Sequence, residues 1–423
     1  MGKNKKKIVK AAGCSMKDCE RRKTVQRKER EEMENFNFYA GTEMIFGKDA
    51  VKGLPEVLDR FGKKVLLGYG GGSIKRTGIY DTIKKLLDEN GFEVYELDGI
   101  EPNPRITSVD RGAKLCKEHG IDVILAAGGG STIDCCKAVA AAAYYDGNPW
   151  DLVCDNSLVE KALPIVTVLT MAATGSEMNR NAVISNMETN EKRALININL
   201  IPQVSFCDPQ YLYTLPAIQT AAGTADILSH LFENYFKNQE AYIPDEFAEG
   251  LMRACLKYCP IALKDPSDYE ARANLMWASS MALNGLTNCG KSGAWSCHPI
   301  EHELSAYYDV THGVGLAIVT PRWMRYILSD KTVDKFVQYA VNVWQMEPSE
   351  DKYALANAAI DATEQFFLDC NIPMTLPEIG IDDSKLRLMA DDTAKYNNLA
   401  AAYVPMTADD VYNILVASMT MEK

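Results

Sequence analysis

The strongest constraint on the fold is an alternation of short apolar runs and amphipathic stretches between residues 64 and 169. Apolar runs of strand length occupy 64–68, 92–97, 122–127 and 164–169, and stretches with helical spacing occupy 77–90, 107–119 and 131–144. Strand, turn and helix repeated in this order favour a parallel sheet covered by helices. After about residue 213 helical stretches dominate: 216–236, 244–258, 269–285, 332–343, 351–370 and 408–421. The sequence therefore predicts an α/β domain followed by an all-helical domain.

Charge and composition divide the chain further. Residues 1–33 contain 12 Lys/Arg and 5 Asp/Glu, whereas the whole chain has a net charge of −12. We predict a disordered basic extension at 1–33, a dinucleotide-binding α/β domain at 34–212 and a helical metal- and substrate-binding domain at 213–423. The acidic body argues against nucleic acid as a partner, and no apolar run reaches the ~18 residues of a membrane helix. Twelve scattered cysteines without a C-x-x-C pair fit free thiols, so we expect a cytoplasmic protein.

Two glycine-rich loops have the same design. Residues 68–73 (GYGGGS) and 128–131 (GGGS) each follow an apolar run and precede a helical stretch. Glycine allows close approach of the backbone to a ligand, and the helix that follows points N–H groups at the loop, which suits phosphate. Neither loop matches G-x-G-x-x-G or a P-loop, but two of them at carboxyl ends of strands favour a dinucleotide lying across the sheet edge. Because Ser73 and Lys75 follow the first loop where an acid would repel a 2′-phosphate, we favour NADP(H) over NAD(H).

Four of the five histidines lie in the helical half, in a spacing that suits a metal. Asp226 and His230 are four residues apart in a helical stretch, so both side chains face the same way. His298 and His302 repeat this spacing, and His312 follows ten residues later. Imidazoles with a carboxylate suit Fe(II) or Zn(II) better than Mg²⁺ or Ca²⁺. The fifth histidine, at position 119, precedes a glycine and fits a helix end.

Together these segments resemble the iron-containing (group III) alcohol dehydrogenases, and most of all their NADPH-dependent butanol dehydrogenase and aldehyde reductase branch. The resemblance covers the chain from about residue 34 to its end. The matching segments are 68–75 (GYGGGSIK), 102–104 (PNP), 128–134 (GGGSTID), 174–179 (TGSEMN), Asp226-x-x-x-His230, and His298-x-x-x-His302 with His312. Their number and order make the resemblance specific, whereas the extension at 1–33 departs from the family pattern.

The resemblance implies a cleft between the two domains and a role for particular residues. It implies that Asp226, His230, His298 and His312 hold the metal, iron or zinc, with His302 beside it. For the cofactor, it places Gly71, Gly72 and Ser73 near the 2′-phosphate, Asn103 on the adenosine side, and Gly130 and Ser131 at the pyrophosphate. Gly129 and Asp134 belong to the same set, and Thr170, Thr174, Ser176 and Lys192 are expected along the ribose and nicotinamide.

The implied activity is hydride transfer between NADP(H) and short-chain aldehydes or primary alcohols, in an enzyme that is expected to be a homodimer. His302 is the candidate proton relay, since a neutral imidazole titrates near physiological pH. Alternatives are an NAD-linked glycerol or diol dehydrogenase, a dehydroquinate-synthase-like lyase of the same architecture, or a non-catalytic nucleotide-binding protein. A lyase acting on a carboxylated, phosphorylated sugar needs a basic pocket, and residues 284–302 supply Lys291 but no arginine.

Overall fold

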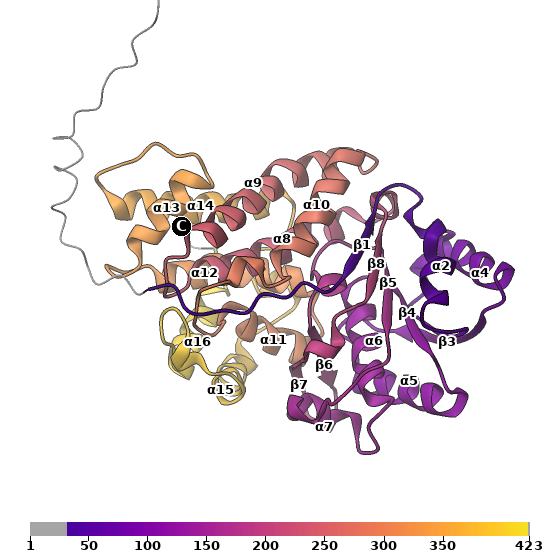
Figure 1. Cartoon of the computed structure of the whole chain (residues 1–423). Coiled ribbons are helices and arrows are strands. Elements are labelled where there is room, and N and C mark those ends of the chain that lie inside the picture. Colours follow the sequence, from indigo (N-terminus) through magenta and orange to yellow (C-terminus); the bar gives the residue numbers. More distant parts are fainter. Residues whose placement is uncertain (1–31, 422–423) are drawn as a thin grey trace, which may run out of the picture.

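A computed structural model describes residues 32–421, so the predicted extension lies almost entirely outside the described residues. The chain forms a sheet-containing part and a helical part side by side (Figure 1). Six parallel strands make the main sheet in the order β1-β8-β5-β4-β2-β3. Their bounds are β1 Glu43–Phe46, β2 Lys64–Gly70, β3 Glu93–Ile100, β4 Val123–Gly128, β5 Ile165–Leu169 and β8 Val204–Cys207. The predicted fold class is confirmed.

Helices cover both faces of this sheet because its central strands are apolar on both sides. Alternate residues of β2 divide between two cores, with Val65 and Leu67 on one face and Leu66 on the other. Helices α2 (Leu54–Asp59) and α4 (Ile79–Glu89) pack on the first face, and α5 (Ile106–His119) and α6 (Gly130–Ala142) pack on the second. A Cβ at Gly68 would lie 2.3 Å from the Cys136 Sγ, so glycine permits the close approach of α6 to β2.

Three strands of the sheet-containing part were not predicted from the sequence. β1 was missed, and so was the antiparallel hairpin of β6 (Asn181–Asn186) and β7 (Glu191–Ile196). The hairpin packs against α6 and against α11 of the helical part, so it forms a wall between the two parts. Residues 197–206 have a strand-like sequence, and they form a 3-10 turn at Ile198–Leu200 followed by the first three residues of β8.

The helical part begins with α8 (Ala217–Tyr235), and within the described chain no strand follows β8. Its other helices are α9 Tyr242–Lys264, α10 Tyr269–Ala282, α11 Cys297–Tyr308, α12 His312–Ile327, α13 Val333–Asn342, α14 Lys352–Asp369, α15 Leu386–Tyr396 and α16 Ala408–Ala417. The sequence analysis missed α11, α12 and α15. Helices α11 and α12 are buried on almost every side, so they lack the polar face that makes a helix periodic in sequence.

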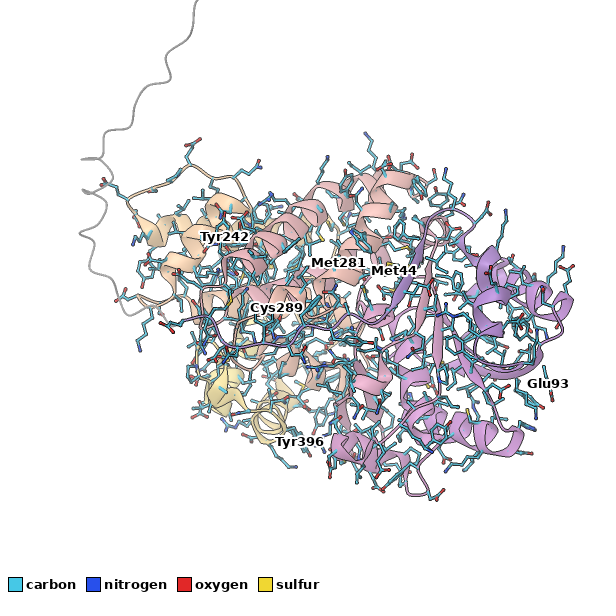
Figure 2. All side chains as sticks on the ribbon, in the orientation of Figure 1. Met44, Glu93, Tyr242, Met281, Cys289 and Tyr396 are labelled. Atoms are coloured by element: carbon cyan, nitrogen blue, oxygen red, sulfur yellow. The ribbon has the colours of Figure 1, made fainter. Side chains whose placement is uncertain are left out.

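Side chains pack densely through both parts (Figure 2). The predicted boundary at 212 and 213 falls between a short 3-10 helix, Pro209–Leu212, and the start of α8. None of the helices among residues 32–421 has the length and apolar character needed to cross a membrane. The ten cysteines of the described chain are all free thiols.

Candidate metal and cofactor site

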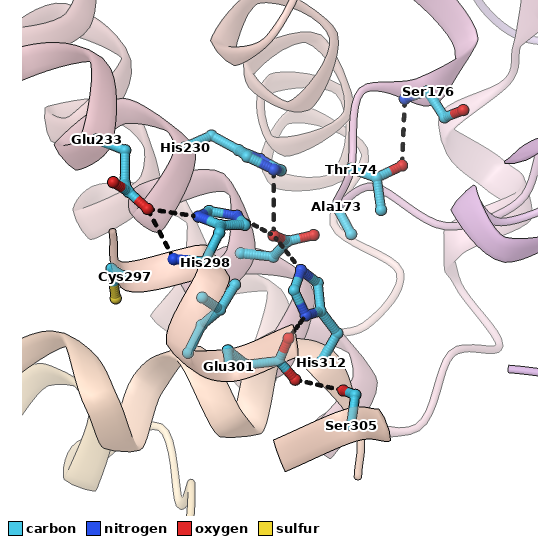
Figure 3. A network of polar contacts seen from close by, with 12 residues as sticks. Ala173, Thr174, Ser176, His230, Glu233, Cys297, His298, Glu301, Ser305 and His312 are labelled. Atoms are coloured by element: carbon cyan, nitrogen blue, oxygen red, sulfur yellow. Dashed lines mark hydrogen bonds and ion pairs between the residues drawn. The ribbon is translucent and has the colours of Figure 1, made fainter. Parts of the chain in front are cut away.

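Three histidines converge on one carboxylate oxygen. The Nε2 atoms of His230, His298 and His312 lie 3.4, 3.6 and 3.7 Å from the Asp226 Oδ1. The i, i+4 spacing on α8 places Asp226 and His230 on one face, and α11 and α12 bring the other two imidazoles to it (Figure 3). All four residues that the resemblance implied as metal ligands are therefore brought together.

Two further carboxylates hold the outer nitrogens of these rings. The Glu233 Oε1 lies 3.2 Å from the His298 Nδ1 and accepts a 2.7 Å hydrogen bond from the His298 backbone N–H. The Glu301 carboxylate contacts the His312 Nδ1 in the same way and also accepts from Ser305. A carboxylate behind the imidazole fixes the ring and leaves Nε2 free, as in many metal centres. The sequence analysis missed both glutamates.

Electrostatics at this point favour a bound positive charge. Burial disfavours the charge on Asp226, but His230, His298 and His312 outweigh it and keep the pKa of the carboxyl well below its usual value. Burial lowers the pKa of His230 to about 3, so its imidazole is neutral. Burial also opposes a charge on His298, yet Asp226 and Glu233 raise its pKa to about 9.

The donor set fits a divalent transition metal. Ligand atoms of Asp226, His298 and His312 lie within 4.8 Å of one another. The Asp226 Oδ1 and the His298 Nε2 are buried without a hydrogen-bond partner, which is costly unless a ligand satisfies them. Nitrogen donors with a single carboxylate suit Fe(II) or Zn(II). The cluster thus has the donor atoms of a transition-metal site, and it lies beside a pocket.

A pocket of about 280 Å³ opens beside the histidines and extends to the sheet-containing part. Its apolar wall includes Leu283 and Trp295, and Val183, Ala194 and Ile196 of the β6–β7 hairpin. The predicted residues that line it together are Asn103, Ser131, Asp134, Thr174, Ser176, Lys192, His230, His298, His302 and His312. The pocket can therefore hold a small apolar group between the histidines and the hydroxyl-bearing loop 174–176.

Trp295 forms one side of this pocket against the histidines. Its ring centroid lies 4.7 Å from that of His298, and its indole N–H donates to the Asn234 Oδ1 at 3.2 Å. The hydrogen bond fixes the rotation of the indole, so its position sets the width of the pocket.

His302 lines the same pocket, and one of its ring nitrogens lies within 4.8 Å of ligand atoms of Glu301 and His312. Its ring centroid is 6.3 Å from that of His298 and 5.6 Å from that of His312. Burial and the nearby Lys192 hold the pKa of His302 well below its ordinary value. Its imidazole is therefore neutral, and the expectation that it titrates near physiological pH is not supported.

Lys192 links the two parts of the molecule. Its Nζ donates to the Asn103 Oδ1 at 3.0 Å and lies 3.6 Å from the Glu301 Oε2. Asn103 in turn donates to Asp309 and to the Val310 carbonyl in the loop between α11 and α12. Asn103 thus lines the same pocket as the histidines, and its expected contact on the adenosine side stays a prediction.

The second glycine loop forms a tight turn at the start of α6. Gly129 precedes the helix, and a Cβ at Gly130 would lie 2.3 Å from the Thr174 Oγ1, so only glycine fits there. The Thr170 N–H donates to the Gly128 carbonyl at 3.0 Å and continues the pairing of β4 with β5 just before this turn. Asp134 accepts from the Ser176 hydroxyl and the Val183 N–H, so its carboxylate holds loop and hairpin together.

The first glycine loop lies apart from this pocket, after β2. Gly71, Gly72 and Ser73 are not among the residues that line the histidine pocket. Gly72 has φ +97°, which favours glycine, and a Cβ at Gly71 would meet nothing within 4 Å. The loop therefore leaves open space beside it, at the same carboxyl-end edge of the sheet as the second loop.

Comparison with known proteins agrees with this architecture. The model of the iron-containing alcohol dehydrogenase family matches residues 41–209, and the model of that family's C-terminal domain matches residues 220–419. NADH-dependent butanol dehydrogenase B of Clostridium acetobutylicum is 52% identical over 92% of this chain and all of its own length. The NADPH-dependent aldehyde reductase YqhD of Escherichia coli is 40% identical over 84% of this chain and 91% of its own.

A solved structure is similar over the same span. The crystal structure of NADH-dependent butanol dehydrogenase A from Thermotoga maritima has a TM-score of 0.88 and 38% identity, covering 92% of this chain and all of that one. Fold, metal-type cluster and comparisons lead to one class: the chain belongs to the iron-containing alcohol dehydrogenase family. It is an oxidoreductase of the alcohol dehydrogenase and aldehyde reductase type, and its family implies a divalent metal and a nicotinamide cofactor.

Proposed function

We propose that this protein reduces short-chain aldehydes to primary alcohols, and oxidises them in reverse, with NADP(H) and one divalent metal, iron or zinc. The observation that carries the proposal is the convergence of three imidazole Nε2 atoms on the Asp226 Oδ1, beside a pocket that reaches the glycine turn of α6. A metal held there supplies Lewis-acid polarisation of a substrate oxygen, and the nicotinamide supplies hydride.

Each residue of the site then has a proposed task. Asp226, His230, His298 and His312 hold the metal, and Glu233 and Glu301 orient His298 and His312. The α6 turn at Gly129, Gly130 and Ser131 faces the pyrophosphate, because a helix N-terminus attracts anions. Thr174, Ser176 and Lys192, which line the pocket, are proposed along the ribose and nicotinamide together with Thr170, which follows β5. Asn103 is proposed on the adenosine side, and Asp134 holds the loop at Ser176.

His302 is proposed to pass the proton that the alcohol oxygen gains or loses. A neutral imidazole can accept a hydrogen bond at one nitrogen and donate at the other, so it relays a proton without storing charge. This task does not require a pKa near neutrality; burial and the nearby Lys192 lower the pKa of His302 well below its ordinary value.

The pocket favours a small aliphatic substrate. Of the residues that line it in the described chain, Lys192 is the one lysine or arginine, and Glu301 and Asn103 already engage it. A carboxylated, phosphorylated sugar would lack partners there, which counts against the lyase alternative. A diol remains the second candidate, because 1,3-propanediol dehydrogenase of Klebsiella pneumoniae is 31% identical over 86% of this chain.

The preference for NADP(H) is supported by the chemistry of the first glycine loop. Residues 70–76 contain no acid, and Ser73, Lys75 and Arg76 accompany the glycines. Relatives are named for different cofactors, NADH in the 52% identical butanol dehydrogenase and NADPH in the aldehyde reductase. We therefore attribute the preference between NADPH and NADH to the residues of the first glycine loop.

The homodimer and the cytoplasmic location stay predictions. β1 lies at one end of the sheet order, so its outer edge is a candidate for pairing with a second copy. Light scattering after size exclusion measures the mass.

The decisive experiment follows absorbance at 340 nm with NADPH or NADH and a panel of short aldehydes, before and after chelator treatment. His230→Ala should lose metal, measured by elemental analysis, together with activity. His119→Ala is the matched control, since that imidazole stacks on Tyr95 outside the pocket. A metal-free His230→Ala variant with full activity would contradict the proposed site.

A further inference from the structure

A charged aromatic cluster lies next to the first glycine loop, separate from the histidine pocket. The exposed Lys75 ammonium rests over two tyrosine rings, 4.7 Å from the centroid of Tyr69 and 4.6 Å from that of Tyr80. Tyr69 is on β2, two residues before Gly71, and Tyr80 is in the first turn of α4. Tyr69 therefore precedes, and Lys75 and Tyr80 follow, the loop where the proposed function expects the 2′-phosphate.

One carboxylate organises these rings. The Tyr69 hydroxyl donates to the Glu96 Oε2 at 2.5 Å, and the Tyr80 hydroxyl donates to the Oε1 at 2.6 Å. The rings meet edge to face with centroids 5.5 Å apart. Glu96 lies on β3, which pairs with β2. Its two oxygens thus lock both tyrosines, and the locked rings provide the surface that holds the lysine.

The cluster holds one positive and one negative charge close together. Burial raises the pKa of Glu96, but the two tyrosine hydroxyls and the nearby Lys75 outweigh it and bring the pKa below its usual value. Glu96 is therefore ionised at neutral pH. A cation over aromatic faces gains attraction from the rings and keeps its charge.

We propose that Lys75, held by Tyr69, Tyr80 and Glu96, sets the preference of this enzyme between NADPH and NADH. The inference rests on the proposed function, because it takes the 2′-phosphate to lie at residues 71–73. Lys75 attracts a phosphate at that position. The Glu96 carboxylate repels the phosphate and partly neutralises the positive charge of Lys75. The two residues therefore affect the preference with opposite sign, which a merely structural role would not produce.

The experiment compares Lys75→Met and Glu96→Gln with the wild type. Glutamine keeps the size of Glu96 and can still bond both hydroxyls, so the change is mainly one of charge. The exposed pair Lys85 and Glu89, at the far end of α4, supplies the matched controls Lys85→Met and Glu89→Gln. The readouts are the ratio of kcat/KM for NADPH over NADH and the Kd of each cofactor from its fluorescence on binding.

Lys75→Met should lower the NADPH to NADH ratio roughly five- to tenfold, and Glu96→Gln should raise it by roughly twofold or more. The effect should shrink in high salt because Lys75 is exposed. Ratios equal to those of the controls, or both variants shifting in one direction, would overturn the inference. If Glu96→Gln fails to fold by circular dichroism, Lys75→Met decides alone, since an exposed side chain is tolerant of change. A wild type that binds both cofactors but reduces no aldehyde would refute the proposed function and leave the Kd ratios to test this cluster.

Discussion

Replacing Glu233 by glutamine should weaken metal binding without removing a ligand. Glu233 is buried, and its carboxylate accepts from the His298 N–H at 2.7 Å and the Ser296 N–H at 2.8 Å while lying 3.2 Å from the His298 Nδ1. Glutamine keeps the shape but loses the negative charge and turns one acceptor into a donor. Loss of such an outer partner typically costs 10–100-fold in metal affinity, or about 1.4–2.7 kcal/mol.

The assay is competition for the metal with a chelator of known affinity, followed by elemental analysis of the protein. Glu364→Gln on α14 is the matched control, because that buried carboxylate pairs with Arg322 and Arg325 away from the histidines. The control should lose stability but retain metal affinity. If Glu233→Gln holds metal within twofold of the wild type, the role assigned to Glu233 is wrong.

Three further changes test other parts of the account. Gly71→Asp should weaken NADPH relative to NADH about tenfold in kcat/KM, because its Cβ has open space and the added charge repels phosphate; an unchanged ratio would remove the loop from the argument. Lys137→Met should lower the free energy of unfolding by about 3–5 kcal/mol in urea titrations, since the buried ammonium donates to Asn179 and the Asn181 carbonyl; a loss below 1 kcal/mol would contradict this. Trp295→Leu should shift an aldehyde panel toward longer chains with metal content retained, and an unaltered panel would show that the indole does not limit the pocket.

Much of the sheet could be predicted because its strands are short and apolar and its helices amphipathic. The predicted strand at 122–127 corresponds to β4 Val123–Gly128, and the predicted helix at 107–119 corresponds to α5. β1 and the β6–β7 hairpin escaped prediction because their residues alternate little and are pinned by tertiary contacts.

Spacing could predict Asp226 and His230 as candidate metal ligands, because an i, i+4 pair on a helix shares a face wherever the helix goes. The choice of His298 and His312 over His302 came from the family resemblance. Glu233 and Glu301 carry a related signal, three residues after His230 and His298 respectively, and a search of the same helix faces would have found them. The contacts of Asn103 could not be predicted, because its partners Lys192 and Asp309 are distant in the chain. The spacing of residues along the chain does not indicate which loops of the two parts lie opposite each other across the pocket.

By itself the sequence determined the two-part architecture, the two glycine turns and the i, i+4 pair of Asp226 and His230, because each depends on local periodicity or spacing. The family resemblance supplied the choice of His298 and His312 as the other two convergent residues. The tertiary structure decided how these pieces meet. Burial makes His302 neutral, Lys192 joins the sheet-containing part to Glu301, and Glu96 reaches Tyr69 and Tyr80 beside the first glycine loop. Desolvation and contacts between distant segments arise only when the chain has folded, so no pattern along the sequence specifies them.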